Sequence, residues 1–200
     1  MRAPLSTILV LTFTVGAFAQ ELTDPERLFE AGQFQRVIEV AQGAGDDPGP
    51  AFLAALSYQK LGQQAGASRL FEQLAGRPAG DPWRLVGESG TRLQAGQIAA
   101  AEQSARDAIA TDPNLAQAHY QLGLVLGHKQ DFSTAAAEFD AAKKLDPDFA
   151  CAYYYAGLSH YRTGRIDLMA SNFETFLKLA PKAPERGEVE SIMRTVRGRR

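Results

Sequence analysis

The stretch Ala137–Phe149, AEFDAAKKLDPDF, decides how the whole chain is interpreted. Its apolar residues return every three to four positions, which is typical of a helix with one buried face. Lys143 and Lys144 lie where cations complement the helix dipole. Pro147 ends the helix, because a proline disfavours helical geometry in the residue before it. We therefore expect a helix that ends near Asp146.

The same helix ending occurs three times at a constant spacing. Pro113, Pro147 and Pro181 are separated by 34 residues each. A turn signal between two helical patterns keeps the same step, at Gly62, Gly96, Gln130 and Gly164. Two helices joined by a tight turn and repeated at this period indicate stacked hairpins, because one hairpin cannot bury its apolar face alone.

The period and its motif residues resemble the tetratricopeptide repeat. In the span 116–149 the motif positions are Leu122, Gly123, Ala135, Phe139, Ala142 and Pro147. Two other copies depart from the pattern: Glu88-Ser89 stands at the Leu-Gly pair, and Met169 and Phe176 are bulkier than the usual alanines. The resemblance implies an all-α, right-handed solenoid of about four to five antiparallel helix hairpins.

The chain divides along this period, and its last 17 residues fit a cap. That segment has an acidic first turn, an apolar stripe and a basic end, as expected of the solvating helix that a solenoid needs. The expected parts are a signal peptide at 1–19, a degenerate hairpin at 20–47, divergent repeats at 48–81 and 82–115, repeats at 116–149 and 150–183, and a capping helix with a basic tail at 184–200.

The first 19 residues have the pattern of an export signal. Arg2 is their only charge, an apolar run begins at Leu5, and Ala17-Phe18-Ala19 has the small-x-small form of a cleavage site. The run is shorter than the roughly 20 apolar residues of a spanning helix. We expect cleavage, no stable membrane insertion afterwards, and a location in the bacterial periplasm or outside the cell. The bacterial compartment rests on the family's use with secretion signals, and a retained anchor is the alternative.

Composition and motifs narrow the function classes. With 21 basic and 23 acidic residues, the chain has no broad basic face for nucleic acid. No phosphate loop, nucleophile elbow or H-E-x-x-H motif is present. His119 and His160 fall on an inward helix face, and His128 and Cys151 lack metal-ligand spacing. We expect no enzyme activity, no cofactor and no metal. A single cysteine also excludes an internal disulfide, and Cys151 is either a small buried residue or a reactive thiol.

The remaining candidate is a surface on the first helix of each hairpin. In the family this helix lines the concave groove, and positions two, five, nine and twelve of the repeat share one helical face. The predicted groove residues are Phe52, Leu56, Trp83, Leu93, Tyr120, Leu124, Tyr154, Leu158 and Tyr161, with His128 and Arg162 at the polar edge. Packing between adjacent first helices is the alternative for each of them.

Three functions follow from this surface. An exposed apolar and aromatic groove suits an extended segment or helix of a partner protein. The carboxylate clamp of chaperone-docking relatives is not evident. The leading hypothesis is a non-enzymatic scaffold, in which Tyr120→Ala with Tyr154→Ala weakens partner capture while helicity persists. The alternatives are a structural subunit or assembly factor of a cell-envelope complex, and a glycan or small-molecule binder.

Overall fold

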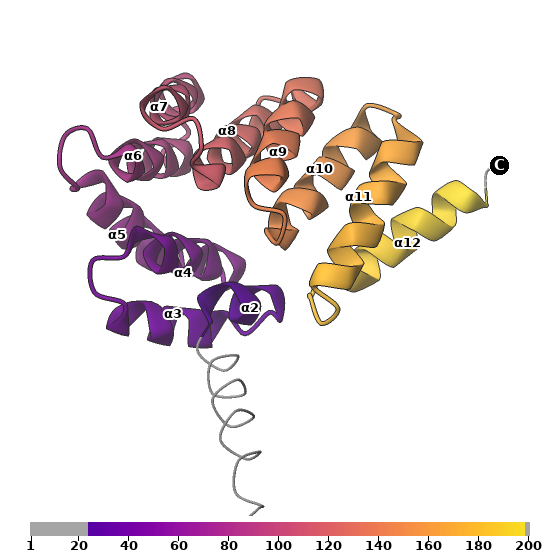
Figure 1. The fold of residues 1–200 in the computed structure, drawn as a ribbon, viewed down its shortest axis with the longest axis horizontal. Coiled ribbons are helices and arrows are strands. Elements are labelled where there is room, and N and C mark those ends of the chain that lie inside the picture. The colour runs from indigo at the N-terminus through magenta and orange to yellow at the C-terminus, as the bar shows by residue number, and fades with distance from the viewer. Residues whose placement is uncertain (1–23, 199–200) are drawn as a thin grey trace, which may run out of the picture.

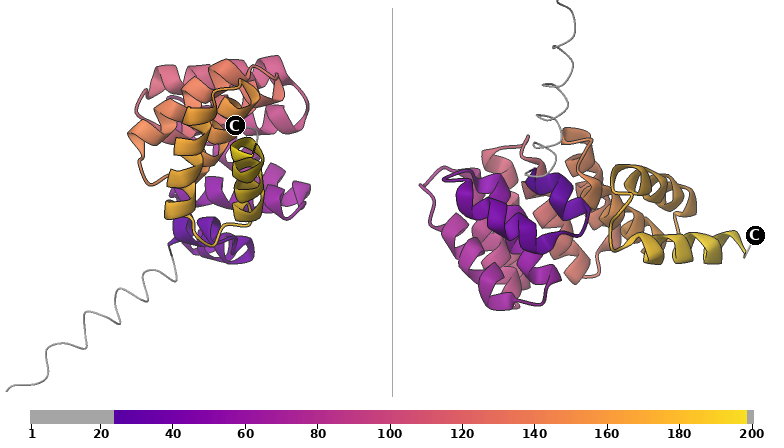
Figure 2. Two further views of the ribbon diagram at one scale, coloured as in Figure 1. Left: turned by 90° about the vertical axis from the view of Figure 1, so that its right-hand side faces the viewer. Right: turned by 90° about the horizontal axis from the view of Figure 1, so that it is seen from below.

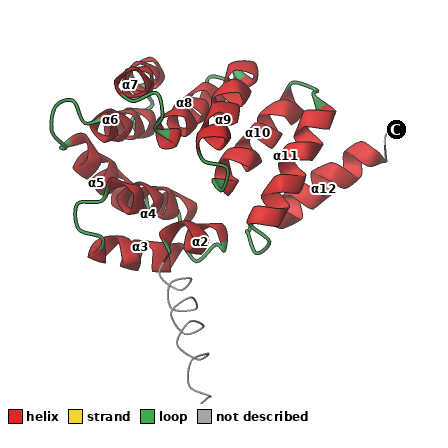
Figure 3. Cartoon of the chain, viewed as in Figure 1, coloured by secondary structure: helices red, strands yellow, loops and turns green. Residues whose placement is uncertain are grey.

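The computed structural model describes residues 24–198. These residues form eleven helices and no strand. Successive helices pack as antiparallel pairs, which follow one another in a curved stack (Figure 1, Figure 3). This arrangement confirms the predicted all-α solenoid of helix hairpins. The predicted signal peptide, residues 1–19, lies outside the described residues.

Each helix pair begins and ends inside one of the spans drawn from the sequence. A single helix, α12, follows the last pair and extends from the end of the stack (Figure 2). The pairs are α2 (Pro25–Glu30) with α3 (Phe34–Gly43), α4 (Pro48–Lys60) with α5 (Gln64–Ala75), α6 (Pro82–Gln94) with α7 (Ile98–Thr111), α8 (Ala116–His128) with α9 (Phe132–Leu145) and α10 (Ala150–Arg162) with α11 (Ile166–Leu179), and α12 is Arg186–Arg197.

Local signals end these helices where the sequence predicted. Helix α9 ends at Leu145, and Asp146 has extended backbone angles, with φ −132° and ψ 93°. In the turns inside the hairpins, a left-handed residue lets the chain reverse. Four of these turns have glycine at φ between 70° and 73°, and Gln130 takes the same conformation at φ 62°. Gln130 is the one non-glycine residue with a positive φ in the described part of the chain.

Small residues let the paired helices approach closely. A methyl carbon on Gly123 would lie 2.6 Å from the ring of Phe139, and one on Gly157 would lie 2.5 Å from the ring of Phe173. Ser89, one period before Gly123, is fully buried, and its hydroxyl donates a hydrogen bond to the carbonyl of Ala101 at 2.9 Å. This bond offsets the cost of burying a polar group, so the departure from glycine is accommodated.

The bulky residues of the last hairpin pack toward the cap. Met169 and Phe176 are buried in one apolar cluster with Val189 and Met193 of α12. A second core cluster includes residues of every hairpin from the first through α10. The side chains of Met169 and Phe176 therefore fill the space between the last hairpin and α12.

The curvature of the stack brings the first two hairpins back to the start of α10 and the turn before α12. The Nζ of Lys60 lies 2.6 Å from a carboxylate oxygen of Glu185, which is 125 residues further along the chain. The amide of Ala150 donates to Glu30 at 3.4 Å. In Figure 1, α2 accordingly lies beside the lower end of α10 and the turn before α12. No feature of the repeat period indicates this contact.

Candidate partner-binding groove

The eleven predicted groove residues divide by exposure. Four of these side chains are buried, five are half-buried and two are exposed. Phe52, Leu56, Tyr120 and Tyr154 are buried; Trp83, Leu93, Leu124, Leu158 and Tyr161 are half-buried; His128 and Arg162 are exposed.

Tyr120 lies at the centre of an aromatic cluster and is only 2% exposed. Its ring centroid is 6.2 Å from that of Phe52, 4.9 Å from Phe149 and 5.7 Å from Tyr155. The contact with Phe52 joins α8 to α4, two repeats earlier. The predicted exposure of Phe52, Tyr120 and Tyr154 is therefore wrong. The stack curves so tightly that first helices of non-adjacent repeats meet, and the packing alternative holds for these side chains.

The open part of the concave face is a groove between α8 and α10, which we call the α8–α10 groove. It encloses about 350 Å³. Its lining is mostly apolar and includes four predicted residues, Leu124, His128, Leu158 and Arg162. The full lining is Gly123, Leu124, Gly127, His128, Phe132, Phe139, Tyr155, Leu158, Ser159, Arg162 and Glu188.

Repeat geometry explains why these side chains converge. Leu124 and Leu158 are one period apart, so they take equivalent places on neighbouring first helices and form two walls of the groove. Gly127 keeps the space between them open, because no atom lies within 4 Å of where its Cβ would stand. Phe132, at the start of α9, was not among the predicted residues. It belongs to a second helix, and its ring supports the guanidinium of Arg162 at 5.7 Å.

Charge is distributed unevenly along this groove. His128 and Arg162 stand exposed on one rim. Glu188 of α12 lines the groove as well and accepts a hydrogen bond from the hydroxyl of Tyr154 at 2.9 Å. Burial, together with Glu188, raises the pKa of Tyr154 above its ordinary value, so the hydroxyl stays a donor at neutral pH. A ligand in the groove would therefore meet a positive charge at Arg162 and a negative charge at Glu188, both exposed.

Two of the histidines, His119 and His160, and the cysteine occupy ordinary structural positions. His119 Nδ1 lies 2.8 Å from Glu138, and this hydrogen bond raises the pKa of the histidine. His160 is 2% exposed, as expected of a core residue; Asp140 lies 3.5 Å away, and burial lowers the pKa of the imidazole. Burial raises the pKa of the half-buried Cys151 thiol to about 12. The thiol is therefore protonated at neutral pH, which opposes a nucleophilic role.

Residues 24–198 contain neither a cluster of metal-ligand side chains nor a helix that could span a membrane. No group of three or more histidine, cysteine, aspartate or glutamate side chains lies close enough together to hold a metal ion among them. No helix in this part of the chain has the length and apolar character that crossing a membrane requires.

The geometry defines a class: helix-hairpin solenoids with an apolar groove on their first helices. Residues 116–149 match the family model described as "Tetratricopeptide repeat". This span contains α8, α9 and the stretch Ala137–Phe149.

Solved structures show the same fold at low identity. A crystal structure of MamA is 19% identical with a TM-score of 0.51, over 74% of this chain and 87% of that chain. A second MamA structure is 18% identical with a TM-score of 0.50, over 86% and 94%. The first TPR of Spaghetti (RPAP3), bound to the HSP90 peptide SRMEEVD, is 15% identical with a TM-score of 0.56, over 60% and 94%. At these identities the likeness is one of fold.

Proposed function

We propose that this protein is a non-enzymatic scaffold that holds a segment of a partner protein in the α8–α10 groove. The observation that carries the proposal is the groove itself, about 350 Å³ of space with mostly apolar walls and the cationic side chain of Arg162 at its edge. Such a site supplies burial for apolar side chains and a few polar groups for orientation. The neighbour solved with a peptide shows that a related fold binds one.

The chemistry of the groove specifies the partner segment. Leu124, Phe132 and Leu158 offer apolar surface to one or two aliphatic or aromatic anchors. The guanidinium of Arg162 complements an acidic residue beside those anchors. The partner is therefore an extended or helical segment with an apolar anchor next to an aspartate or glutamate. A purely polar segment does not use these apolar walls.

A peptide display library, selected against the purified protein, tests the proposal. Selected peptides are measured by calorimetry against three variants. Gly127→Leu inserts a side chain where nothing lies within 4 Å, so it blocks the groove without disturbing packing. Arg162→Glu reverses the rim charge. Lys144→Glu, at an exposed position of α9 outside the groove, is the matched control.

The expected outcome separates the three variants. Gly127→Leu and Arg162→Glu each weaken binding by about tenfold or more, which corresponds to about 1.4 kcal/mol. Lys144→Glu stays within about twofold of the wild type. Selected peptides that bind Gly127→Leu as tightly as the wild type would show that the groove is not the site.

Export completes the proposal. The pattern in residues 1–19 supports secretion before folding, to the periplasm or the exterior. Sequencing the amino terminus of the protein purified from its source should find Gln20 first. A mature protein that begins with Met1 would overturn this part.

A further inference from the structure

The first two hairpins meet the start of α10 and the turn before α12 in a small contact, which we call the closing contact. It consists of the Lys60–Glu185 ion pair, the packing of Pro184 on Gly32, and the hydrogen bond from the amide of Ala150 to Glu30. Pro184 lies so close that a methyl carbon on Gly32 would stand 2.7 Å from its ring. The contact joins parts of the chain that the repeat period keeps far apart.

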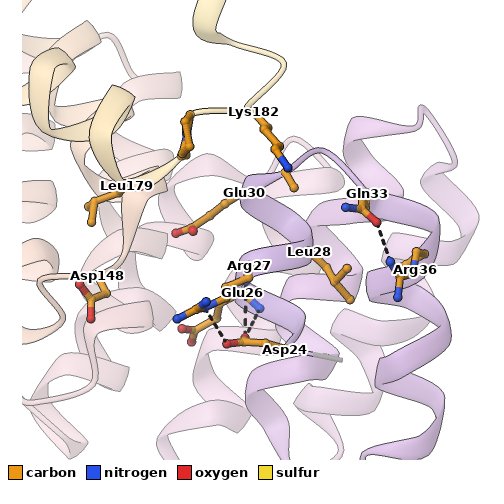
Figure 4. Close-up of a pocket in the computed structure, with 13 residues that line it drawn as sticks. Asp24, Glu26, Arg27, Leu28, Glu30, Gln33, Arg36, Asp148, Leu179 and Lys182 are labelled. Carbon is orange, nitrogen blue, oxygen red and sulfur yellow. Dashed lines mark hydrogen bonds and ion pairs between the residues drawn. The ribbon is translucent and has the colours of Figure 1, made fainter. Parts of the chain in front are cut away.

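The closing contact is weakly packed compared with the hairpins. A polar cavity of about 580 Å³ opens between α2 and the segment 179–182 (Figure 4). Carboxylates face each other across it, from Asp24, Glu26 and Glu30 on one side and Asp148 on the other, with Arg27, Arg36 and Lys182 also on its wall. Charges of both signs line this cavity, and Arg27 pairs with Asp24 at 3.6 Å. A polar cavity supplies little apolar packing, so the few direct contacts must hold this part of the stack closed.

The same contact covers one side of the concave face. Lys60 Nζ lies 5.9 Å from the ring centroids of both Tyr154 and Tyr155. Tyr155 is also part of the lining of the α8–α10 groove. Lys60 and the α8–α10 groove therefore meet the same aromatic side chain. Removing Lys60 and its partner Glu185 would extend the groove toward Tyr154.

We propose that the closing contact is a latch that switches the concave face between a short groove and a longer one. In the closed state only the α8–α10 groove is open. Separation of Lys60 from Glu185 and of Gly32 from Pro184 lets the turn before α12 move apart from the first two hairpins, which uncovers Tyr154 and the side of Tyr155 that Lys60 covers. The role of this longer groove in partner binding rests on the proposed function, whereas the latch itself is a property of the isolated protein.

Distance measurements on the full chain test the latch without any partner. Nitroxide labels are placed at Glu39 of α3 and Lys178 of α11, both exposed, in a Cys151→Ala background. Electron paramagnetic resonance then reports the separation of the first hairpin from the last repeat. The wild type should give one narrow distance distribution.

Charge variants should move this distribution in a defined pattern. Lys60→Glu places two carboxylates in the closing contact and should shift the distribution to longer, broader distances. Lys60→Glu combined with Glu185→Lys restores an ion pair and should restore the narrow distance. Lys129→Glu is the control, because Lys129 pairs with Glu102 at the same 2.6 Å between neighbouring repeats. It should leave the distance unchanged.

A variant without a charge change, checked for intact helices, separates opening of the closing contact from a loss of folding. Pro184→Ala trims the contact with Gly32 and should also lengthen the distance, while circular dichroism reports intact helices. If Lys60→Glu and Pro184→Ala both keep the narrow wild-type distance, the latch is wrong. If the charge swap fails to restore it, the ion pair is not what holds the latch. Neither result depends on whether a peptide binds.

Discussion

Gly87 lies at a close approach of α6 to α5, and replacing it tests the packing of the solenoid. A methyl carbon at this position would stand 2.4 Å from the backbone nitrogen of Ala75 and 2.6 Å from the Cβ of Leu74. It would also stand 2.7 Å from the carbonyl oxygen of Phe71. Two of these three atoms are backbone, so no side-chain rotation relieves the clash. Gly87→Ala must move one helix relative to the other.

Two opposing effects determine how much Gly87→Ala changes the free energy of unfolding. Overpacking a well-packed core costs about 1–3 kcal/mol, and contact with backbone puts Gly87→Ala near the upper end. Alanine in a helix interior is favoured over glycine by about 1 kcal/mol. The expected net loss in the free energy of unfolding is about 2 kcal/mol.

Urea denaturation followed by far-ultraviolet circular dichroism measures this loss, with Gly127→Ala as the matched control. Gly127 is also inside a first helix, but nothing lies within 4 Å of its Cβ position. Gly127→Ala should therefore gain up to about 1 kcal/mol from helix propensity alone. If Gly87→Ala is as stable as the wild type, or if both variants shift in the same direction, the close-approach reasoning is refuted.

Three further predictions concern the core, the turns and the closing contact. Tyr120→Ala should destabilise the fold by roughly 3–5 kcal/mol in the same assay, because the ring is buried; preserved stability would contradict its place in the core. Gln130→Gly should raise the unfolding free energy by up to about 1 kcal/mol, since glycine takes positive φ without strain, and a loss would indicate an unseen role of the side chain. Burial raises the pKa of Glu30 to about 7 from 4.5, so the folded state holds its proton more tightly and the stability from this group falls as pH rises from about 4.5 through 7. Glu30→Gln should remove that fall and be more stable than the wild type at pH 8 by roughly 1 kcal/mol after solvent screening, as pH-dependent denaturation would show; equal stability at pH 8 would contradict it.

Structural features that involve only one repeat and its neighbour could be predicted from the sequence. Pro147 and the amphipathic pattern before it predicted where α9 ends, and the period predicted the helix pairs. The pairing of Gly123 with Phe139 follows from the same register. These features are local, since a helix end or a hairpin contact involves residues within about one period of each other.

The curvature of the stack depends on contacts between distant repeats, and the repeat period does not predict these contacts. The ring of Phe52 meets that of Tyr120, and Lys60 meets Glu185 across 125 residues. Helical periodicity predicts that Phe52 and Tyr120 share one face of the first helices, but it does not say whether that face is open. The answer depends on small rotations between hairpins, which add up over the stack. For this reason the burial of Tyr120 could not be predicted.

Exposure along the first helices now locates the open part of the concave face. At position five of the repeat every side chain is buried, as Phe52, Val86, Tyr120 and Tyr154 show. The residues at position nine are buried in the two earlier repeats, where they are Leu56 and Gly90. In the two later repeats they are Leu124 and Leu158, which are half-buried. At position twelve all four residues are half-buried: Gln59, Leu93, Gly127 and Tyr161. The concave face is therefore closed near the start of each first helix and opens toward its end, most widely in the last two repeats. A partner segment in the proposed α8–α10 groove would meet Leu124, Leu158, Tyr155 and Arg162, whereas Tyr154 is buried beneath Lys60 of the closing contact.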